Sequence, residues 1–335
     1  MIAKTEASDI RFRPHFKTHQ NKKIAHLFRE KGVDAITVSS LKMAEFFAAD
    51  GWSDITIAIP TDLNELAGIE ALARKISLTL IVDNAAHLEG LKKLKTSVNV
   101  MIEVDNGYGR SGIFVKKHRQ IFDLIRQIKE ETGLRFSGLL THFGNTYKAT
   151  SREEIKEIAL DSLRDFSTLR NYLEPLTGEK IFISAGDTPS ASVLDRFEGI
   201  DELRPGNFVF YDLMQLGAGS CDLSQIAVVM RCPVISKNAA RKQLIIHGGA
   251  VHFSKESIVF EGAESYGRAV DVSSENFKLL SANLISLSQE HGIVQCNARE
   301  FERFRIGDYI HIIPVHSCLT ANLMKEDLIF VDKRK

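Results

Sequence analysis

Short apolar runs alternate with segments of helical spacing along the first two-thirds of the chain. Several runs are almost continuously apolar, such as those at residues 55–59 and 100–104. Runs of this kind are typical of parallel strands that are buried on both faces. The pattern predicts eight strands, at residues 11–17, 34–40, 54–59, 78–83, 98–105, 135–143, 181–186 and 202–211.

Segments with helical spacing separate these strands. Their apolar residues recur three and four positions apart, which indicates helices at residues 41–50, 63–74, 116–132 and 151–173. Eight strand–helix units favour a (β/α)8 barrel of the TIM type, whose active site lies at the carboxyl ends of the strands. We therefore predict a barrel at residues 1–215, with the residues that follow each strand lining one mouth.

The pattern changes after residue 212. Small residues at 216–220 predict a flexible hinge, and one helix is expected at about residues 275–290. The rest predicts a small C-terminal β-rich domain at residues 216–335. Its short strands are expected at residues 226–234, 243–247, 257–261, 293–297, 309–314 and 328–331.

Composition argues against several classes of protein. The 335 residues are 44% hydrophobic and 26% charged, as in an ordinary soluble globular protein. Basic and acidic residues both number 43, so no net charge attracts nucleic acid or an anionic membrane. No apolar run approaches the length of a membrane span, and residues 1–13 do not resemble a signal peptide. The four cysteines lie far apart, which predicts reduced thiols in a cytoplasmic protein.

A lysine between two histidines stands near the start, in Arg13-Pro-His15-Phe-Lys17-Thr-His19. The pattern puts Lys17 on the first strand, which we expect to be buried. Burial lowers the pKa of a lysine and makes the neutral amine available, as Schiff-base chemistry requires. A basic patch on an edge strand is the alternative that these residues leave open.

Two loops after the predicted seventh and eighth strands have features of phosphate sites. Gly186-Asp-Thr188-Pro-Ser190 places a glycine and small hydroxyls before a helix, whose first N–H groups can bind an anion. Arg204-Pro-Gly206-Asn207 offers a second pair of backbone N–H groups. In many barrels these two loops form a phosphate site. A phosphorylated cofactor beside a reactive lysine suggests pyridoxal phosphate, and no P-loop or dinucleotide motif occurs.

A candidate metal pair lies near the C-terminus, in Pro314-Val-His316-Ser-Cys318. On an extended segment, residues two apart point to the same side, and imidazole and thiolate are both good zinc ligands. Two protein ligands are too few for a structural site, so a metal held here would be catalytic. A buried cysteine beside a surface histidine is the alternative interpretation.

Six segments together are more informative than any one alone. They are residues 13–19, 103–112, 184–190, 204–212, 289–292 and 314–320. In this order they resemble the D-serine dehydratase and D-threonine aldolase group of fold-type III pyridoxal-phosphate enzymes. These enzymes are relatives of alanine racemase and combine a barrel with a β domain. The resemblance runs from about residue 11 to the C-terminus.

The resemblance implies a role for each site residue. Lys17 would hold pyridoxal 5'-phosphate and later act on the Cα proton of the substrate. His316 and Cys318 would bind a divalent metal, zinc or manganese, that coordinates the β-hydroxyl of the substrate. Arg110 would bind the phenolic oxygen of the cofactor. The remaining cofactor contacts would come from His15, Tyr147, Gly186, Thr188, Gly206 and Asn207, the last four at the phosphate.

The implied function is a metal-dependent lyase acting on D-β-hydroxy amino acids, of the D-serine dehydratase or D-threonine aldolase type. The pairing of histidine with Cys318 rather than with aspartate favours dehydration. A racemase without metal is one alternative, although no clear second acid or base opposite Lys17 is apparent. A non-catalytic pyridoxal-phosphate homeostasis protein is the other, and the β domain argues against it.

The resemblance also implies a homodimer, in which the β domain faces the barrel mouth of the partner. Family members usually begin with a strand of the β domain, ahead of the lysine strand. Here only residues 1–10 precede the lysine strand. Either the sequence starts late, as a fragment or a misassigned start would, or the β domain lacks a strand, and we expect an unpaired sheet edge.

Overall fold

The computed structural model describes residues 1–273 and 277–331, which form two compact units. The first unit is Met1–Gly206 and the second is Asn207–Lys335. The division falls earlier in the chain than the expected boundary at residue 215. The residues expected to form a hinge, 216–220, lie inside the second unit, where α9 (Leu213–Gly217) covers the first two of them.

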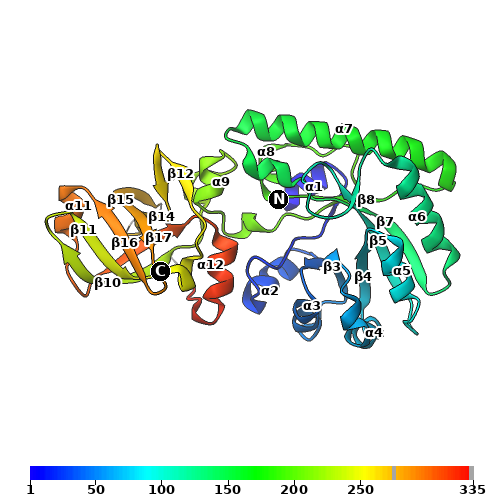
Figure 1. Cartoon of the computed structure of the whole chain (residues 1–335), viewed down its shortest axis with the longest axis horizontal. Coiled ribbons are helices and arrows are strands. Elements are labelled where there is room, and N and C mark those ends of the chain that lie inside the picture. Colours follow the sequence, from blue (N-terminus) through cyan, green and yellow to red (C-terminus); the bar gives the residue numbers. More distant parts are fainter. Residues whose placement is uncertain (274–276, 332–335) are drawn as a thin grey trace. The chain divides into compact units, whose positions relative to one another are not determined.

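The first unit is a parallel sheet of eight strands in barrel order, with helices along its outer side (Figure 1). The order is β1-β9-β8-β7-β5-β4-β3-β2, and a ninth strand, β6 (Ile113–Phe114), pairs with β5 outside this path. This confirms the predicted barrel class. The eight strands are β1 (Arg11–Phe12), β2 (Ile36–Val38), β3 (Asp54–Pro60), β4 (Ser77–Val82), β5 (Val98–Asp105), β7 (Leu134–Leu140), β8 (Ile183–Ala185) and β9 (Glu202–Leu203).

The helices present apolar stripes to the sheet. In α6 the buried residues recur at helical spacing, at Ile121, Leu124, Ile125 and Ile128. The Ser151 side chain caps the first turn of α7, which ends at Gly178 in the left-handed conformation. The helices of this unit are α1 (Ile2–Ala7), α2 (Lys22–Glu30), α3 (Leu41–Ala48), α4 (Leu66–Ala73), α5 (Ala85–Leu91), α6 (His118–Glu130), α7 (Arg152–Thr177) and α8 (Thr188–Val193), with short 3-10 helices at Leu63–Glu65 and Gly144–Lys148.

The barrel closes between β1 and β2 through a short contact. His15 forms an isolated bridge with Thr37. The Phe16 N–H donates to the Thr37 carbonyl at 2.8 Å, and the Thr37 N–H donates to the Pro14 carbonyl at 3.0 Å. Since Pro14 has no N–H, it cannot extend a regular ladder on both sides.

Lys17 consequently does not lie on a strand. The first strand was predicted at residues 11–17, but β1 ends at Phe12 and residues 16–19 form a turn. The side chain of Lys17 is exposed, so the predicted buried lysine is wrong. The turn nevertheless follows directly on the first strand, at the carboxyl edge of the barrel.

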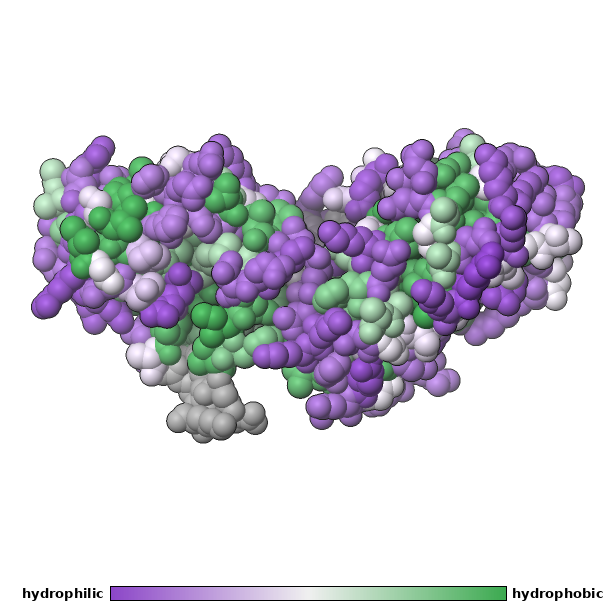
Figure 2. Space-filling view, turned by 90° about the horizontal axis from the view of Figure 1, so that it is seen from below, coloured by the Kyte–Doolittle hydropathy of each residue, from purple (hydrophilic) through white to green (hydrophobic). Residues whose placement is uncertain are grey.

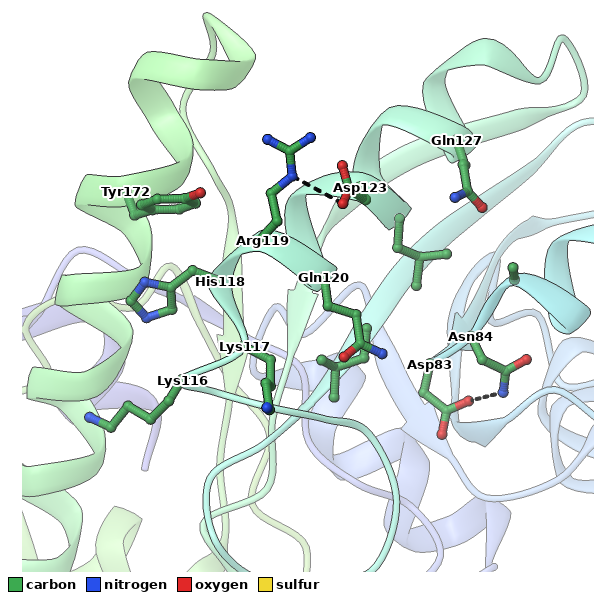
Figure 3. Close-up of a pocket in the computed structure, with 13 residues that line it drawn as sticks. Asp83, Asn84, Lys116, Lys117, His118, Arg119, Gln120, Asp123, Gln127 and Tyr172 are labelled. Carbon is green, nitrogen blue, oxygen red and sulfur yellow. Dashed lines mark hydrogen bonds and ion pairs between the residues drawn. The ribbon is translucent and has the colours of Figure 1, made fainter.

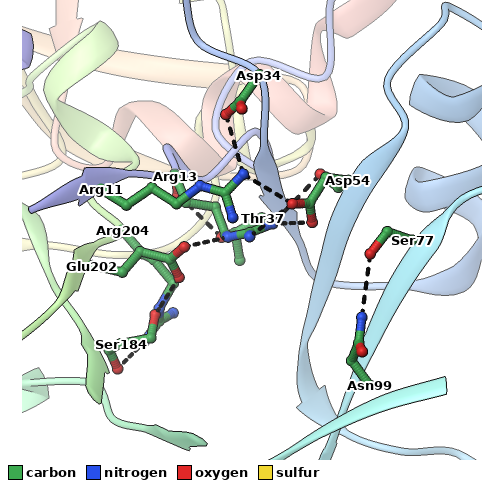
Figure 4. A network of polar contacts seen from close by, with 10 residues as sticks. All are labelled: Arg11, Arg13, Asp34, Thr37, Asp54, Ser77, Asn99, Ser184, Glu202 and Arg204. Carbon is green, nitrogen blue, oxygen red and sulfur yellow. Dashed lines mark hydrogen bonds and ion pairs between the residues drawn. The ribbon is translucent and has the colours of Figure 1, made fainter. Parts of the chain in front are cut away.

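A buried ion-pair network fills the barrel interior beneath this contact (Figure 4). Arg13, only 5% exposed, donates to Glu202 Oε2 at 2.6 Å and to Asp54 Oδ1 at 2.7 Å. The Ser184 hydroxyl donates to Glu202 Oε1 at 2.6 Å and accepts from Arg204 Nε at 2.6 Å. These contacts tie β1 to β3, β8 and β9.

The second unit is built on a closed barrel of six antiparallel strands. Its neighbours follow the order β10-β11-β16-β15-β14-β17, and β17 returns to β10. A closed barrel has no open edge, so the unpaired edge expected for this domain is wrong. The strands are β10 (Met230–Asn238), β11 (Gln243–His247), β14 (Gly267–Asp271), β15 (Lys278–Leu287), β16 (His291–Cys296) and β17 (Tyr309–Pro314), with a separate hairpin of β12 (Ile258–Phe260) and β13 (Ala263–Ser265).

Short helices flank this barrel. They are α9, α10 (Ala250–Phe253), α11 (Ala298–Arg303) and α12 (Ser317–Leu323), with 3-10 turns at Asn207–Val209, Leu223–Gln225 and Lys325–Asp327.

Two further predictions of secondary structure in the second unit are wrong. The helix expected at about residues 275–290 is the strand β15, although residues 275 and 276 lie outside the described residues. Leu280 and Leu284 fit a helical period, but Ala282 is buried with them, and hydrogen bonds to strands on both sides favour the extended chain. No strand forms over the described residues 328–331.

The surface is mainly polar. Figure 2 shows hydrophilic residues over most of one face, broken by separate apolar areas. None of the described helices is long and apolar enough to cross a membrane. The four cysteines form no disulfide, and Cys221, Cys232 and Cys296 are buried.

We expect Glu202→Ala to lower the free energy of unfolding by about 3–5 kcal/mol, because it removes the carboxylate that pairs with the buried Arg13 and that Arg204 reaches through the Ser184 hydroxyl. Urea unfolding followed by circular dichroism measures the change. Glu198→Ala is the control, since Glu198 is exposed in a neighbouring loop and its loss should cost about 0.5 kcal/mol or less. Equal effects of the two substitutions would contradict a structural role for the network.

Candidate active site

Basic side chains gather at the carboxyl ends of the strands of the first unit. Burial, together with the charges of Lys17, Arg204 and His142, holds the pKa of His15 well below its usual value. Burial, together with the charges of Lys17, Arg110 and Arg204, lowers the pKa of His142 to about 4, although the hydrogen bond with the Gly186 carbonyl acts in the opposite direction. Both imidazoles are therefore neutral near pH 7, while the cations around them make this mouth favourable for an anion.

His15 and Lys17 occupy one turn. The Lys17 backbone N–H approaches His15 Nδ1 at 3.4 Å, and Ser39 Oγ lies 3.4 Å from His15 Nε2. The imidazole is thus fixed between the lysine turn and the segment that follows β2. The His15 imidazole thereby fixes the backbone of Lys17, although the Lys17 side chain is exposed to solvent.

The loops after β8 and β9 lie against each other, as a phosphate-binding pair requires. Gly186 adopts φ +147°, and a Cβ there would lie 2.7 Å from the Arg204 backbone nitrogen. At Gly206 a Cβ would lie 3.0 Å from the His15 carbonyl oxygen and from Thr18 Oγ1. Both glycines are therefore required by close approach of the backbone.

Not every N–H group at the start of α8 is available. The buried Asp187 caps the helix by accepting from the Ser190 N–H at 2.9 Å. The Thr188 N–H points to the Tyr147 hydroxyl at 3.4 Å, which brings two of the predicted cofactor residues together. His142 also belongs to this group of residues, because its Nδ1 lies 3.0 Å from the Gly186 carbonyl oxygen.

Arg110 lies in the glycine-rich loop after β5. Its guanidinium is 3.9 Å from Glu103 and 5.6 Å from the centroid of the Tyr108 ring. Burial raises the pKa of Glu103, and Arg110 acts in the opposite direction. Glu103 Oε2 is buried and has no hydrogen-bond partner among the described residues.

These features fit pyridoxal phosphate. A surplus of positive charge, two glycine-bearing loops and a lysine on an adjoining turn are the requirements for an anionic group with a reactive aldehyde. Thr141 Oγ1 and Glu103 Oε2 are buried polar atoms left without partners among the described residues, and both belong to residues at the ends of strands at this mouth.

The second unit contains the predicted metal pair, His316 and Cys318, at the start of a helix instead of on an extended segment. His316 is the N-cap residue of α12 and Cys318 lies in its first turn, so the segment is not extended. The two side chains still interact, because Cys318 contributes to the pKa of His316. Glu256 Oε2 lies 2.6 Å from His316 Nδ1. Burial opposes protonation of His316, but hydrogen bonds with Cys318 and Glu256 outweigh it and raise the pKa to about 10.

A buried carboxylate holds this turn. Asp212 Oδ2 accepts from the Ser317 N–H at 2.9 Å and from the Ser317 hydroxyl at 3.1 Å. The amide nitrogen of Asn207 donates to the same oxygen at 2.6 Å and lies 3.4 Å from Cys318 Sγ. Thiol and imidazole are side chains that suit a divalent cation such as zinc, and the Glu256 and Asp212 carboxylates hold the segment that carries them.

The structure thus groups the predicted residues in two sets. His15, Lys17, Arg110, Tyr147, Gly186, Thr188 and Gly206 belong to the first unit, whereas Asn207 lies with His316 and Cys318 in the second. Sequence reasoning missed Glu256, which is 60 residues from His316 in the chain. Nothing in the local sequence signals that contact.

A pocket of about 710 Å³ opens elsewhere in the first unit, between the turn after β4, α6 and α7 (Figure 3). Its lining includes several charged residues, and the His118 and Tyr172 rings lie next to each other on one side of it, with centroids 5.1 Å apart. Lys17 and the other predicted site residues are not in its lining. We therefore locate the chemistry at the strand ends and not in this pocket.

A barrel mouth of this kind, joined to a β-barrel unit, defines an alanine racemase-like protein. Residues 2–213 match the family of the alanine racemase N-terminal domain, and residues 227–330 match the putative serine dehydratase domain. The chain belongs to the alanine racemase N-terminal domain family. Pyridoxal phosphate is the cofactor expected for this family.

Individual relatives span nearly the whole chain. The D-threo-3-hydroxyaspartate dehydratase of Delftia sp. is 29% identical over 96% of this chain and 87% of the relative. Its solved structure superimposes with a TM-score of 0.87 at 27% identity and the same coverage. The D-serine dehydratase of Dictyostelium discoideum is 27% identical over 95% of this chain and 85% of the relative. These similarities confirm the family resemblance stated from the motifs.

The turn that carries Lys17 also contains a histidine that we expect to destabilise the protein in acid. His19 is 2% exposed, its ring packs at a tilt against the Phe16 ring with centroids 4.5 Å apart, and burial lowers its pKa to about 3. Since the folded pKa lies below the unfolded value of about 6.5, protonation favours the unfolded chain as pH falls below that value. His19 should therefore cost about 2 kcal/mol of stability between pH 8 and pH 5.

His19→Phe should remove this loss, and urea unfolding at the two pH values measures it. Comparing each protein with itself at pH 8 cancels the packing change that the substitution causes. If the variant lost as much stability at pH 5 as the parent protein, the buried neutral state of His19 would be contradicted.

Proposed function

We propose that this protein is a lyase that uses pyridoxal phosphate and a divalent metal to cleave D-β-hydroxy amino acids. The observation that carries the proposal is the donor set of His316 and Cys318 with Glu256 behind the imidazole. A racemase of this fold needs no metal ligands, whereas removal of a β-hydroxyl as hydroxide requires a Lewis acid to take its charge. The relatives named as dehydratases support the same class.

Residues of the first unit, together with Asn207 at the start of the second, would hold the cofactor. Lys17 would bind it through its amine, next to the neutral His15. The N–H groups of the loops at Gly186 and Gly206 would receive the phosphate, with Thr188 and Asn207 as further phosphate contacts. Tyr147 would line the same site, and Arg110 would bind the phenolic oxygen of the cofactor. When bound, pyridoxal phosphate supplies an electron sink for a carbanion at Cα.

Residues of the second unit would hold the metal, either zinc or manganese. His316 would bind through Nε2, because Glu256 occupies the Nδ1 side and fixes the orientation of the ring. Cys318 would supply a thiolate, and the Asp212 carboxylate would keep the turn between the two ligands in place. Among the relatives of known structure, a cysteine-to-alanine variant of a D-threo-3-hydroxyaspartate dehydratase is described in a metal-free form.

Dehydration is the reaction we favour for this site. Cys318 would then assist loss of the β-hydroxyl, giving a keto acid and ammonia, while aldol cleavage would give glycine and an aldehyde. D-serine and D-threo-3-hydroxyaspartate are the substrates to test first, since the relatives matched over most of this chain are named for them.

We further propose that the protein is a cytoplasmic homodimer. The second unit exposes large apolar side chains, with Val259 77%, Ile329 74% and Val331 76% accessible. Exposed apolar area of this kind is typical of association surfaces. Analytical ultracentrifugation tests the dimer, and a monomer that is fully active at low concentration would rule it out.

Lys17→Ala should abolish covalent attachment of pyridoxal phosphate, because its amine is the group that bonds the aldehyde. Borohydride reduction followed by peptide mass spectrometry should find the cofactor on residue 17 of the parent protein and none on the variant. Lys31→Ala, which changes another exposed lysine of the first unit, should keep the attachment. A reducible cofactor at full occupancy in Lys17→Ala would show that the assignment is wrong.

Removal of the metal should abolish conversion of D-serine and of D-threo-3-hydroxyaspartate while leaving the bound cofactor in place, since the two groups are held by different residues. Chelated and zinc-restored protein are compared by keto-acid release and by the visible absorption of the cofactor. Cys318→Ala should lose turnover but keep exchange of the substrate Cα proton with solvent, which deuterium incorporation measures.

Glu256→Gln should weaken the proposed metal site without abolishing it. It should weaken zinc binding by about 10- to 100-fold, since the amide orients the imidazole less firmly than the carboxylate. Should chelated protein convert D-serine at the full rate, the lyase mechanism fails and a metal-free racemase takes its place.

A further inference from the structure

Three metal-ligating side chains of the second unit meet at its surface, apart from the residues assigned above. His247 ends β11, His252 lies in α10, and Glu290 lies in the turn between β15 and β16. One ligand atom of each lies within 4.8 Å of those of the other two. We propose that these residues form a second metal site, which binds zinc or a similar first-row divalent ion.

The separations are close to those that a bound ion needs. His247 Nε2 lies 3.5 Å from Glu290 Oε2, and the His247 and His252 rings are 5.2 Å apart between centroids. In a tetrahedral zinc site with bonds of about 2.0–2.1 Å, neighbouring ligand atoms are about 3.4 Å apart. One pair already has this spacing, and side-chain rotation can bring the third ligand to it.

The backbone that carries the three residues is held rigidly. The Gly248 N–H donates to the Glu290 carbonyl at 2.9 Å, and the Ala250 N–H donates to the Ser288 carbonyl at 2.8 Å. A Cβ at Gly249 would lie 2.2 Å from the Gln289 carbonyl oxygen, so only glycine allows this approach. The start of α10 and the β15–β16 turn are therefore fixed against each other before any ion binds.

The chemistry of the ligands selects the class of ion. Two imidazoles and one carboxylate favour zinc, nickel or copper over calcium and magnesium, which prefer oxygen ligands. His247 and Glu290 are 54% and 45% exposed at their side chains, so an ion can enter from solvent and keep a water ligand. This site uses none of the residues proposed to hold the catalytic metal.

Binding has one identifiable cost. The Gly249 N–H donates to His252 Nδ1 at 3.1 Å, which places the ring proton on Nε2. His252 must give up this hydrogen bond, either by turning its ring or by binding the ion through Nδ1. We therefore expect weaker binding than at a closed four-ligand site, in the micromolar range.

The number of zinc ions bound per chain tests the proposal. Full-length protein is stripped with a chelator, dialysed and titrated with zinc alone in a calorimeter, and sites tighter than about 100 µM are counted. His247→Ala/His252→Ala should bind one ion fewer than the parent chain. His291→Ala, an exposed histidine beside Glu290, is the matched control and should keep the full number.

The count also separates this site from the catalytic one. Loss of one ion in His247→Ala/His252→Ala supports the second site whether or not His316 and Cys318 bind metal. An unchanged count overturns the proposal and identifies the cluster as an ordinary surface ion pair. In that case, one ion retained by the double variant and lost in Cys318→Ala would still support the proposed lyase.

Discussion

The first unit depends on the ion pair between Arg13 and Glu202. Two charges are removed from water inside the barrel, and this is tolerated only because each is paired and hydrogen bonded. Strand β1 has only two residues, and its regular backbone pairing is with β9 alone. The side chain of Arg13, just after β1, adds a second attachment by joining this segment to Glu202 of β9 and to Asp54 of β3. The contacts of Arg13 therefore also fix the position of the turn that carries Lys17.

A carboxylate has a similar role in the second unit. Asp212 is buried beneath the turn from His316 to Cys318 and accepts hydrogen bonds from both the backbone and the side chain of Ser317. Burial raises the pKa of Asp212, while His316 and the N–H donors around it act in the opposite direction. In both units the residues expected to react are themselves partly accessible, and a buried acid fixes the segment that carries them.

The sequence predicts the parts of this protein that follow a clear period. The strand predicted at residues 98–105 is β5 (Val98–Asp105), and the helix predicted at residues 116–132 contains α6. The strand β15 was mistaken for a helix because Leu280 and Leu284 satisfy both periods and only the surrounding strands decide between them. The exposure of Lys17 follows from the contact of residues 14–16 with Thr37, which is a tertiary feature, although Pro14 in the sequence already argued against a regular strand through this segment. Glu256 and the cluster of His247, His252 and Glu290 are contacts across the fold, which spacing cannot signal.

The contact between β1 and β2 makes the barrel a ring with one weak joint. Regular ladders of two or more residue pairs hold the other neighbouring strands, but here the joint has an isolated bridge at Thr37, two backbone hydrogen bonds and the bond from the Thr37 hydroxyl to the Arg13 carbonyl. Local opening needs the least free energy where the fewest hydrogen bonds break. The lysine turn is attached at this joint, so it can part from β2 while the remaining strands stay paired. A ligand bound to both Lys17 and the loops after β8 and β9 would then hold the contact between β1 and β2 closed. Release of the ligand would allow the barrel to open at this contact while the other strands stay paired.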